Sequence, residues 1–313
     1  MSKTKITLAI AASYFIFAIL LNSVGTVILQ SINTLGVSKT EASVLEGFKD
    51  LSIAIMSFVV ASFIPRLGYK LAMLGALAVV ALACLSTALI SEFYMFKVLF
   101  AVIGCGFAVV KVSVYSIIGQ VTEDVNSHSS LLNTIEGIFM VGVLSGYWIF
   151  TAFIDPSQSN AWLNVYYALA ALTLIVLLSV VIAPIAPAID KNKTDSSLSD
   201  FIAMLKLTYQ PLVLIFIISA FLYVLIEQGV GTWLPTFNNQ VLQLPVAISI
   251  QLASIFAAAL AFGRLVAGQV LKHINWFFVL CGCLVAMALL IIITLPLTEN
   301  LPNTAITSLF DAP

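Results

Sequence analysis

The feature that most constrains this sequence is a succession of about nine apolar runs, each long enough to cross a membrane. They cover residues 6–30, 43–64, 70–90, 94–120, 130–154, 162–185, 210–236, 246–271 and 276–296. A spanning α-helix needs about 20 mostly apolar residues. The 313 residues are 61% hydrophobic and 9% charged, whereas a soluble domain is about 45–50% apolar and about 25% charged. We therefore predict an all-α, polytopic bundle of membrane helices.

The basic residues of the short connections predict how the bundle is oriented, because such residues favour the cytoplasmic side. With the N-terminus in the cytoplasm, the inner side receives Lys3, Lys5, Arg66, Lys70, Lys191, Lys193, Lys206 and Lys272, and the outer side receives Lys39 and Lys97. The first apolar run is longer than the hydrophobic region of a cleaved signal peptide, so we interpret it as a span. We expect an integral protein of a bacterial-type cytoplasmic (inner) membrane.

Several classes of function are disfavoured by what the sequence lacks. The net charge is −1 without a basic stripe, so we expect no nucleic-acid partner. The cysteines all fall in apolar runs and are interpreted as small buried hydrophobic residues: Cys84, Cys105, Cys281 and Cys283. We find no H-E-x-x-H motif, paired aspartates or Ser/His set. We expect no enzymatic activity, no metal and no cofactor.

The apolar runs divide into two groups at the polar segment 186–206 (APAIDKNKTDSSLSDFIAMLK). We predict a six-helix bundle at residues 1–185, a cytoplasmic linker at 186–207 and a partial second bundle at 208–313. Short basic turns follow the second and the eighth run, which suggests a weak internal repeat. Transporters built from such repeats work by alternating access.

Two sequence segments then indicate a family. The turn PRLGYK at residues 65–70 resembles the turn between the second and third helices of the major facilitator superfamily, although Pro65 and Ala61 replace its usual acidic residue and glycine. The segment 223–237 (YVLIEQGVGTWLPTF), with Gly263, Arg264 and Gly268, is similar to the fucose, glucose and galactose proton symporters.

The resemblance implies a monomer that moves a small-molecule solute across the lipid bilayer with a proton or sodium ion. It also implies gating roles for Arg66, Lys70 and Arg264. A complete member of this family has twelve spans, so we expect the chain to be truncated at its C-terminus.

Lys111 is the ionisable residue that stands out most, because it interrupts the apolar run 101–120. A cation at this depth costs on the order of 2.5–3.5 kcal/mol, so it should face water or a partner. Lys111 lies about nine residues, roughly 14 Å, from the inner end of its span, and Glu136 lies about six residues, roughly 9 Å, from the same surface. We predict an ion pair between them. Such a pair either serves transport or merely neutralises two buried charges.

Other ionisable residues lie in the second and seventh spans. Glu46, Lys49 and Asp50 share one helix face, as a coupling or gating group or as a local ion pair at a wet interface. Acidic residues of the first and fourth helices serve coupling in the symporters that this chain resembles. This chain has Asn22 and Gln30 in the first of those helices and Lys111 in the fourth, so Glu136 and Glu227 are the substitute candidates, followed by Asp50.

Neutral polar and aromatic residues complete the candidate cavity. Asn22, Asn133 and Gln228 could bind hydroxyl groups, and Tyr14, Tyr115, Tyr223 and Trp233 could stack on the apolar face of a sugar. Trp233 could equally be an interfacial anchor. The leading hypothesis is an ion-coupled transporter of a sugar or related metabolite. The alternative is an exporter of drugs or anionic metabolites on the same fold.

Overall fold

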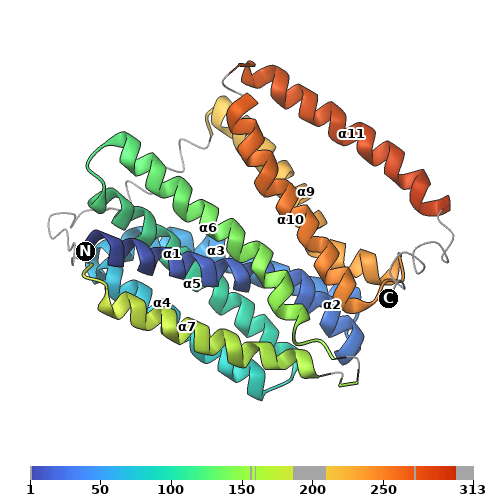
Figure 1. Cartoon of the computed structure of the whole chain (residues 1–313), viewed down its shortest axis with the longest axis horizontal. Helices are drawn as coiled ribbons and strands as arrows, with labels where there is room; N and C mark the ends of the chain where they lie inside the picture. Colours follow the sequence, from blue (N-terminus) through green and yellow to red (C-terminus); the bar gives the residue numbers. More distant parts are fainter. Residues whose placement is uncertain (1, 156, 159, 186–208, 271–272, 301–313) are drawn as a thin grey trace. The chain divides into compact units, whose positions relative to one another are not determined.

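The computed structural model describes residues 2–155, 157–158, 160–185, 209–270 and 273–300, and its regular elements are helices (Figure 1). They are α1 (Ser2–Asn22), α2 (Val24–Leu35), α3 (Lys39–Leu67), α4 (Tyr69–Leu89), α5 (Phe93–Val121), α6 (Val125–Thr151), the short 3₁₀-helix η1 (Ala161–Asn164), α7 (Val165–Ile182), α9 (Pro211–Gln240), α10 (Val246–Val270) and α11 (Trp276–Asn300). In the described residues, eight spans have the length and composition needed to cross a membrane. The predicted all-α membrane bundle is confirmed. The helix α3, which covers the predicted second span, is not among those eight.

The first predicted span is divided into α1 and α2 at Ser23. The Ser23 hydroxyl donates a 2.7 Å hydrogen bond to the Leu20 carbonyl, and the Asn22 side-chain amide donates a 2.9 Å hydrogen bond to the Ala18 carbonyl. Side chains that bond to the carbonyls of the preceding turn compete with the backbone ladder and often bend helices. Two such bonds coincide at the break between α1 and α2.

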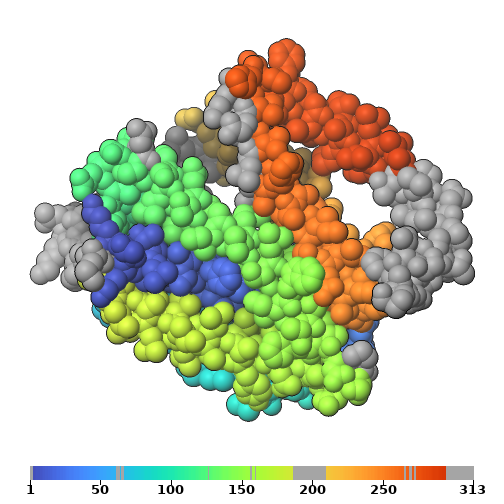
Figure 2. Space-filling model, viewed as in Figure 1, coloured from blue at the N-terminus to red at the C-terminus, as the bar shows by residue number. Residues whose placement is uncertain are grey.

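The chain forms two compact units, and the first comprises Met1 to Trp233. Within it, α1 contacts α5, α6 and α7, and on the face shown in Figure 2 it lies in a band between α6 and α7. The largest fully buried side chains of this unit are mostly aromatic or branched: Tyr14, Tyr166, Phe17, Phe96, Phe100, Phe150, Ile10, Ile16, Ile19, Leu20, Ile28 and Leu29. This apolar core holds α1 against its neighbours.

Glycines let some of these helices approach very closely. A Cβ atom added at Gly142 of α6 would lie 2.7 Å from the Phe15 carbonyl oxygen of α1, and one at Gly104 of α5 would collide with the Lys49 carbonyl oxygen of α3. Small residues at such points let backbones pack directly, which membrane bundles use in place of a hydrophobic driving force.

Contacts at one end of the bundle join segments that the sequence places in the cytoplasm. Lys3 forms a 2.8 Å ion pair with Glu123, and Lys70 donates hydrogen bonds of 2.8 and 2.7 Å to the carbonyls of Val181 and Ala183. Gly68, between α3 and α4, has φ of 86°, a conformation that glycine adopts readily. The PRLGYK segment thus forms the expected tight connection.

The second unit comprises Leu234 to Pro313. The turn between α9 and α10 is held by side-chain amides, because Asn238 donates to the Ser249 carbonyl at 3.1 Å and Asn239 donates to the Leu244 carbonyl at 2.8 Å. The predicted linker at 186–207 lies outside the described residues, so the division of the chain at that segment stays a prediction.

Candidate functional site

Four aromatic side chains of α1, α5 and α6 gather within the first unit. The Tyr14 ring lies 5.7 Å from Phe139, 6.1 Å from Phe107 and 6.3 Å from Tyr115, measured between ring centroids, and Phe107 lies 5.9 Å from Phe139. Phe107, Lys111 and Tyr115 follow each other at intervals of four residues on α5, so they share one helix face. These four aromatic residues, together with Lys111 and Glu136, are called the aromatic–ionic cluster: Tyr14, Phe107, Lys111, Tyr115, Glu136 and Phe139.

Lys111 lies between two rings of this cluster. Its Nζ atom is 5.7 Å from the Phe107 centroid and 5.8 Å from the Tyr115 centroid, within the range of about 6 Å for a cation–π contact. The side chain is exposed, and no carboxylate oxygen of the described residues lies within 4 Å of Nζ. The direct ion pair predicted between Lys111 and Glu136 is therefore not formed in this structure.

Tyr115 takes the place predicted for Lys111. Its hydroxyl donates a 2.7 Å hydrogen bond to Oε1 of the half-buried Glu136. Tyr115 lies about five residues, roughly 7.5 Å, from the inner end of its span at Gln120, close to the roughly 9 Å of Glu136 and far from the roughly 14 Å of Lys111. Depth therefore favours the tyrosine as the partner of this carboxylate.

Glu46, Lys49 and Asp50 of α3 take part in two separate interactions. Lys49 is 4% exposed, and its Nζ atom lies 3.4 Å from Oδ1 of the partly exposed Asp50. Glu46 instead accepts a 2.7 Å hydrogen bond from the Thr232 hydroxyl of α9. The shared face that the spacing predicts is thus divided between a local ion pair and a contact with the seventh span.

Gly25 lies beside the same threonine. A Cβ atom added at Gly25 would lie 2.5 Å from the Thr232 carbonyl oxygen, so the backbones of α2 and α9 approach closely at this point. Together with the hydrogen bond from the Thr232 hydroxyl to Glu46, this contact joins the first two predicted spans to the seventh. Thr232 was not a candidate from the sequence, because one threonine near the end of a span carries no distinguishing signal.

The remaining candidate residues are not part of the aromatic–ionic cluster. The Asn22 amide bonds within its own helix, and Trp233 packs against the core of the first unit. Lys70 caps the carbonyl end of α7, which is a structural contact in this state. Other candidates are exposed or half-buried on their helices: Asn133, Tyr223, Glu227 and Gln228. The side chains of Arg66 and Arg264 lie outside the described part.

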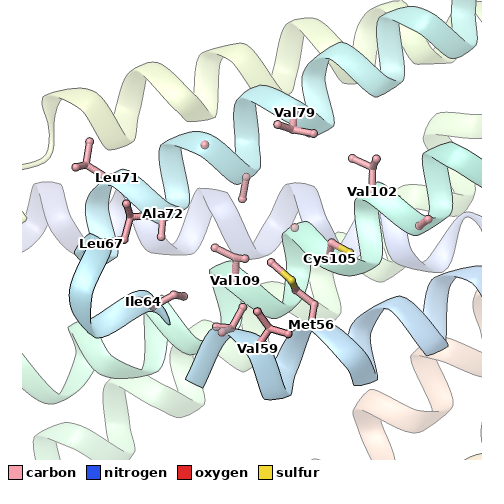
Figure 3. A pocket seen from close by; sticks show the side chains of 15 residues that line it. Met56, Val59, Ile64, Leu67, Leu71, Ala72, Val79, Val102, Cys105 and Val109 are labelled. Carbon is pink, nitrogen blue, oxygen red and sulfur yellow. The ribbon is translucent and has the colours of Figure 1, made fainter. Parts of the chain in front are cut away.

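A separate cavity of about 610 Å³ lies between α3, α4 and α5. Figure 3 shows apolar side chains of the three helices around it, among them Met56, Leu71, Val79 and Val109. Its lining consists of aliphatic residues, one methionine, Cys105 and two glycines. A polar solute would find no side-chain hydrogen-bond partner there, so the aromatic–ionic cluster is the better candidate site.

The sequence matches the family model of the Major Facilitator Superfamily over residues 8–310. The chain belongs to the major facilitator superfamily and is an integral membrane protein and a secondary transporter. This family is not enzymatic, which confirms the expectation that the protein is not an enzyme. Its members bind small-molecule substrates.

Solved structures share the fold at low sequence identity. A D-xylose–proton symporter matches with a TM-score of 0.64 and 14% identity, over 87% of this chain and 70% of that chain. The nucleoside transporter NupG matches with a TM-score of 0.63 and 15% identity, over 86% of this chain and 66% of that chain. No curated protein matches the sequence at a significant level. Identities this low establish the fold alone.

Proposed function

We propose that this transporter moves a small polar solute, a sugar or related metabolite, by alternating access coupled to an ion. The observation that carries the proposal is the Tyr115–Glu136 hydrogen bond beside the exposed Lys111. Ionisable groups within membrane spans are expensive and usually mark a solute or ion pathway. The exposed ring of Tyr115 offers a surface on which the apolar face of a sugar could stack.

Coupling requires a group that interacts differently in the two access states. Glu136 is the candidate, because its carboxylate accepts a hydrogen bond from a neighbouring span and could exchange this bond for a proton or a sodium ion. Glu46 is the second candidate, because its bond to Thr232 connects spans far apart in the chain. We take residues 186–207 as the linker between the two sets of spans.

The experiment that tests this proposal is uptake by the purified protein in proteoliposomes. Labelled sugars and nucleosides are suitable first solutes, since a xylose–proton symporter and a nucleoside transporter share the fold. We expect an inward proton or sodium gradient to stimulate uptake and Glu136→Gln to abolish the stimulation. Glu92→Gln, at the start of α5, is the control. Uptake that is indifferent to both gradients would indicate facilitated diffusion instead.

One observation favours export of an anionic metabolite as the second candidate. No carboxylate oxygen of the described residues lies within 4 Å of the Lys111 Nζ atom, which suits an anionic cargo. Flux measured separately in right-side-out and inside-out vesicles distinguishes the two candidates. Net movement of solute out of the cytoplasm would favour the exporter, and concentrative uptake would favour the symporter.

A further inference from the structure

Lys111 forms no ion pair with a carboxylate of the described residues. No described carboxylate oxygen lies within 4 Å of its Nζ atom, and Glu136 is engaged by the Tyr115 hydroxyl. The two rings beside Nζ hold the ammonium group in place but add no negative charge. A lysine in the middle of a span that lacks a protein partner should face a water-filled path or a ligand.

A second lysine on the same helix, Lys97, lies where the end of a span can solvate its charge. Lys97 lies one turn after the start of α5, with its Nζ atom 4.9 Å from the Phe93 ring. At the end of a span, water and lipid headgroups can solvate such a charge. Lys111 lies fourteen residues further along α5, about 21 Å at 1.5 Å per residue, so this explanation does not extend to it.

We propose that the solute itself supplies the missing charge, and that Lys111 binds the carboxylate of a hydroxylated organic acid such as a sugar acid. This inference rests on the proposed function, because it places the solute in the aromatic–ionic cluster. A lysine ammonium binds an anion as a compact point charge with three donors. The exposed ring of Tyr115 lies beside the ammonium group, with its centroid 5.8 Å from Nζ. The exposed face of this ring can pack against the carbon skeleton of such an acid.

The experiment compares solutes that differ only at the carboxylate. Isothermal titration of the purified protein would use glucuronate against glucose, and galacturonate against galactose. We expect the acids to bind at least about tenfold more tightly, the factor for losing one charge-assisted hydrogen bond. Lys111→Met should remove this preference, Lys111→Arg should retain most of it, and Lys97→Met should leave it unchanged.

The outcomes separate this inference from the proposed function. Equal or tighter binding of the neutral sugars would overturn the anionic assignment and leave sugar transport intact. Failure of both acids to bind saturably would also overturn it, as would a preference that survives in Lys111→Met. Loss of gradient-driven flux for every solute, with the Lys111-dependent preference for acids retained, would overturn the transport proposal instead.

Discussion

The Tyr115 hydroxyl donates a 2.7 Å hydrogen bond to Oε1 of Glu136, which joins α5 to α6 within the predicted membrane spans. The same tyrosine lies beside the ammonium group of Lys111, with its ring centroid 5.8 Å from Nζ. One side chain therefore contacts both the cation and the carboxylate of the candidate site. A change in the charge of either residue would therefore alter the electrostatic environment of the other, because both contact Tyr115.

Tyr115→Phe separates the two roles of this side chain, because it removes the hydroxyl and keeps the ring. A hydrogen bond to a charged group contributes about 1.5–3 kcal/mol, so we expect transport to fall by roughly tenfold or more. The transport rate of Tyr115→Leu should fall further, since this substitution also removes the cation–π contact. Initial rates in proteoliposomes measure both, with the exposed Tyr94→Phe on the same helix as control. Wild-type rates in Tyr115→Phe would show that the hydrogen bond has no part in transport.

Gly25→Ala tests the close approach of α2 to α9. The new methyl group would lie 2.5 Å from the Thr232 carbonyl oxygen, whereas Gly47→Ala on α3 meets nothing within 4 Å. Both substitutions gain about 1 kcal/mol of helix propensity, but overpacking costs about 1–3 kcal/mol at Gly25 alone. We expect a lower Tm for Gly25→Ala than for Gly47→Ala in detergent. Equal Tm values would indicate that the two helices are free to separate.

Gly142→Ala tests the contact between α1 and α6 in the same way. Its Cβ atom would lie 2.7 Å from the Phe15 carbonyl oxygen and 2.8 Å from Cβ of Ala18, and Gly137 on the same helix has open space. We expect Gly142→Ala to lower Tm, since overpacking by about 1–3 kcal/mol exceeds the gain in propensity, and Gly137→Ala to raise it slightly. A Tm for Gly142→Ala at or above that of Gly137→Ala would contradict the packing described.

The contact between Lys3 and Glu123 gives a pH dependence outside the membrane spans. The hydrogen bond and the charge of Lys3 hold the pKa of Glu123 below its ordinary value. A carboxyl group with a lowered pKa stabilises the folded state above its ordinary pKa, and this contribution is lost as pH falls through the lowered value. We expect Lys3→Met to raise the titration midpoint of Glu123 in a carboxyl NMR experiment. Lys5→Met is the control, and an unchanged midpoint in Lys3→Met would exclude the contact in solution.

Much of the fold could be predicted from the sequence, because apolar runs of span length in a chain with few charges leave little alternative to a helical membrane bundle. The break at Ser23 could not, since serine and asparagine are common within spans without bending them. Lys111 was identified because a charge is conspicuous in an apolar run. Phe107 and Phe139 were missed for the opposite reason, as nothing distinguishes one phenylalanine from its apolar neighbours.

The predicted ion pair between Lys111 and Glu136 is wrong, because depth and charge alone do not show that a neutral tyrosine lies closer to the carboxylate. Lys111 and Glu136 were both within reach by depth, but Tyr115 lies one helical turn nearer to the level of Glu136. The contact of Glu46 with Thr232 could not be foreseen either. It depends on how the seventh span packs against the second, which periodicity and composition do not determine.

We propose that Lys111 and its aromatic neighbours lie on the solute path. The most direct test is the initial rate of solute flux in proteoliposomes for the wild type, Lys111→Met and Lys97→Met, at matched amounts of inserted protein. We expect the flux of Lys111→Met to fall to about a tenth of the wild-type rate or less, the effect of losing one charged hydrogen bond, and that of Lys97→Met to stay close to wild type. Wild-type flux in Lys111→Met would contradict it.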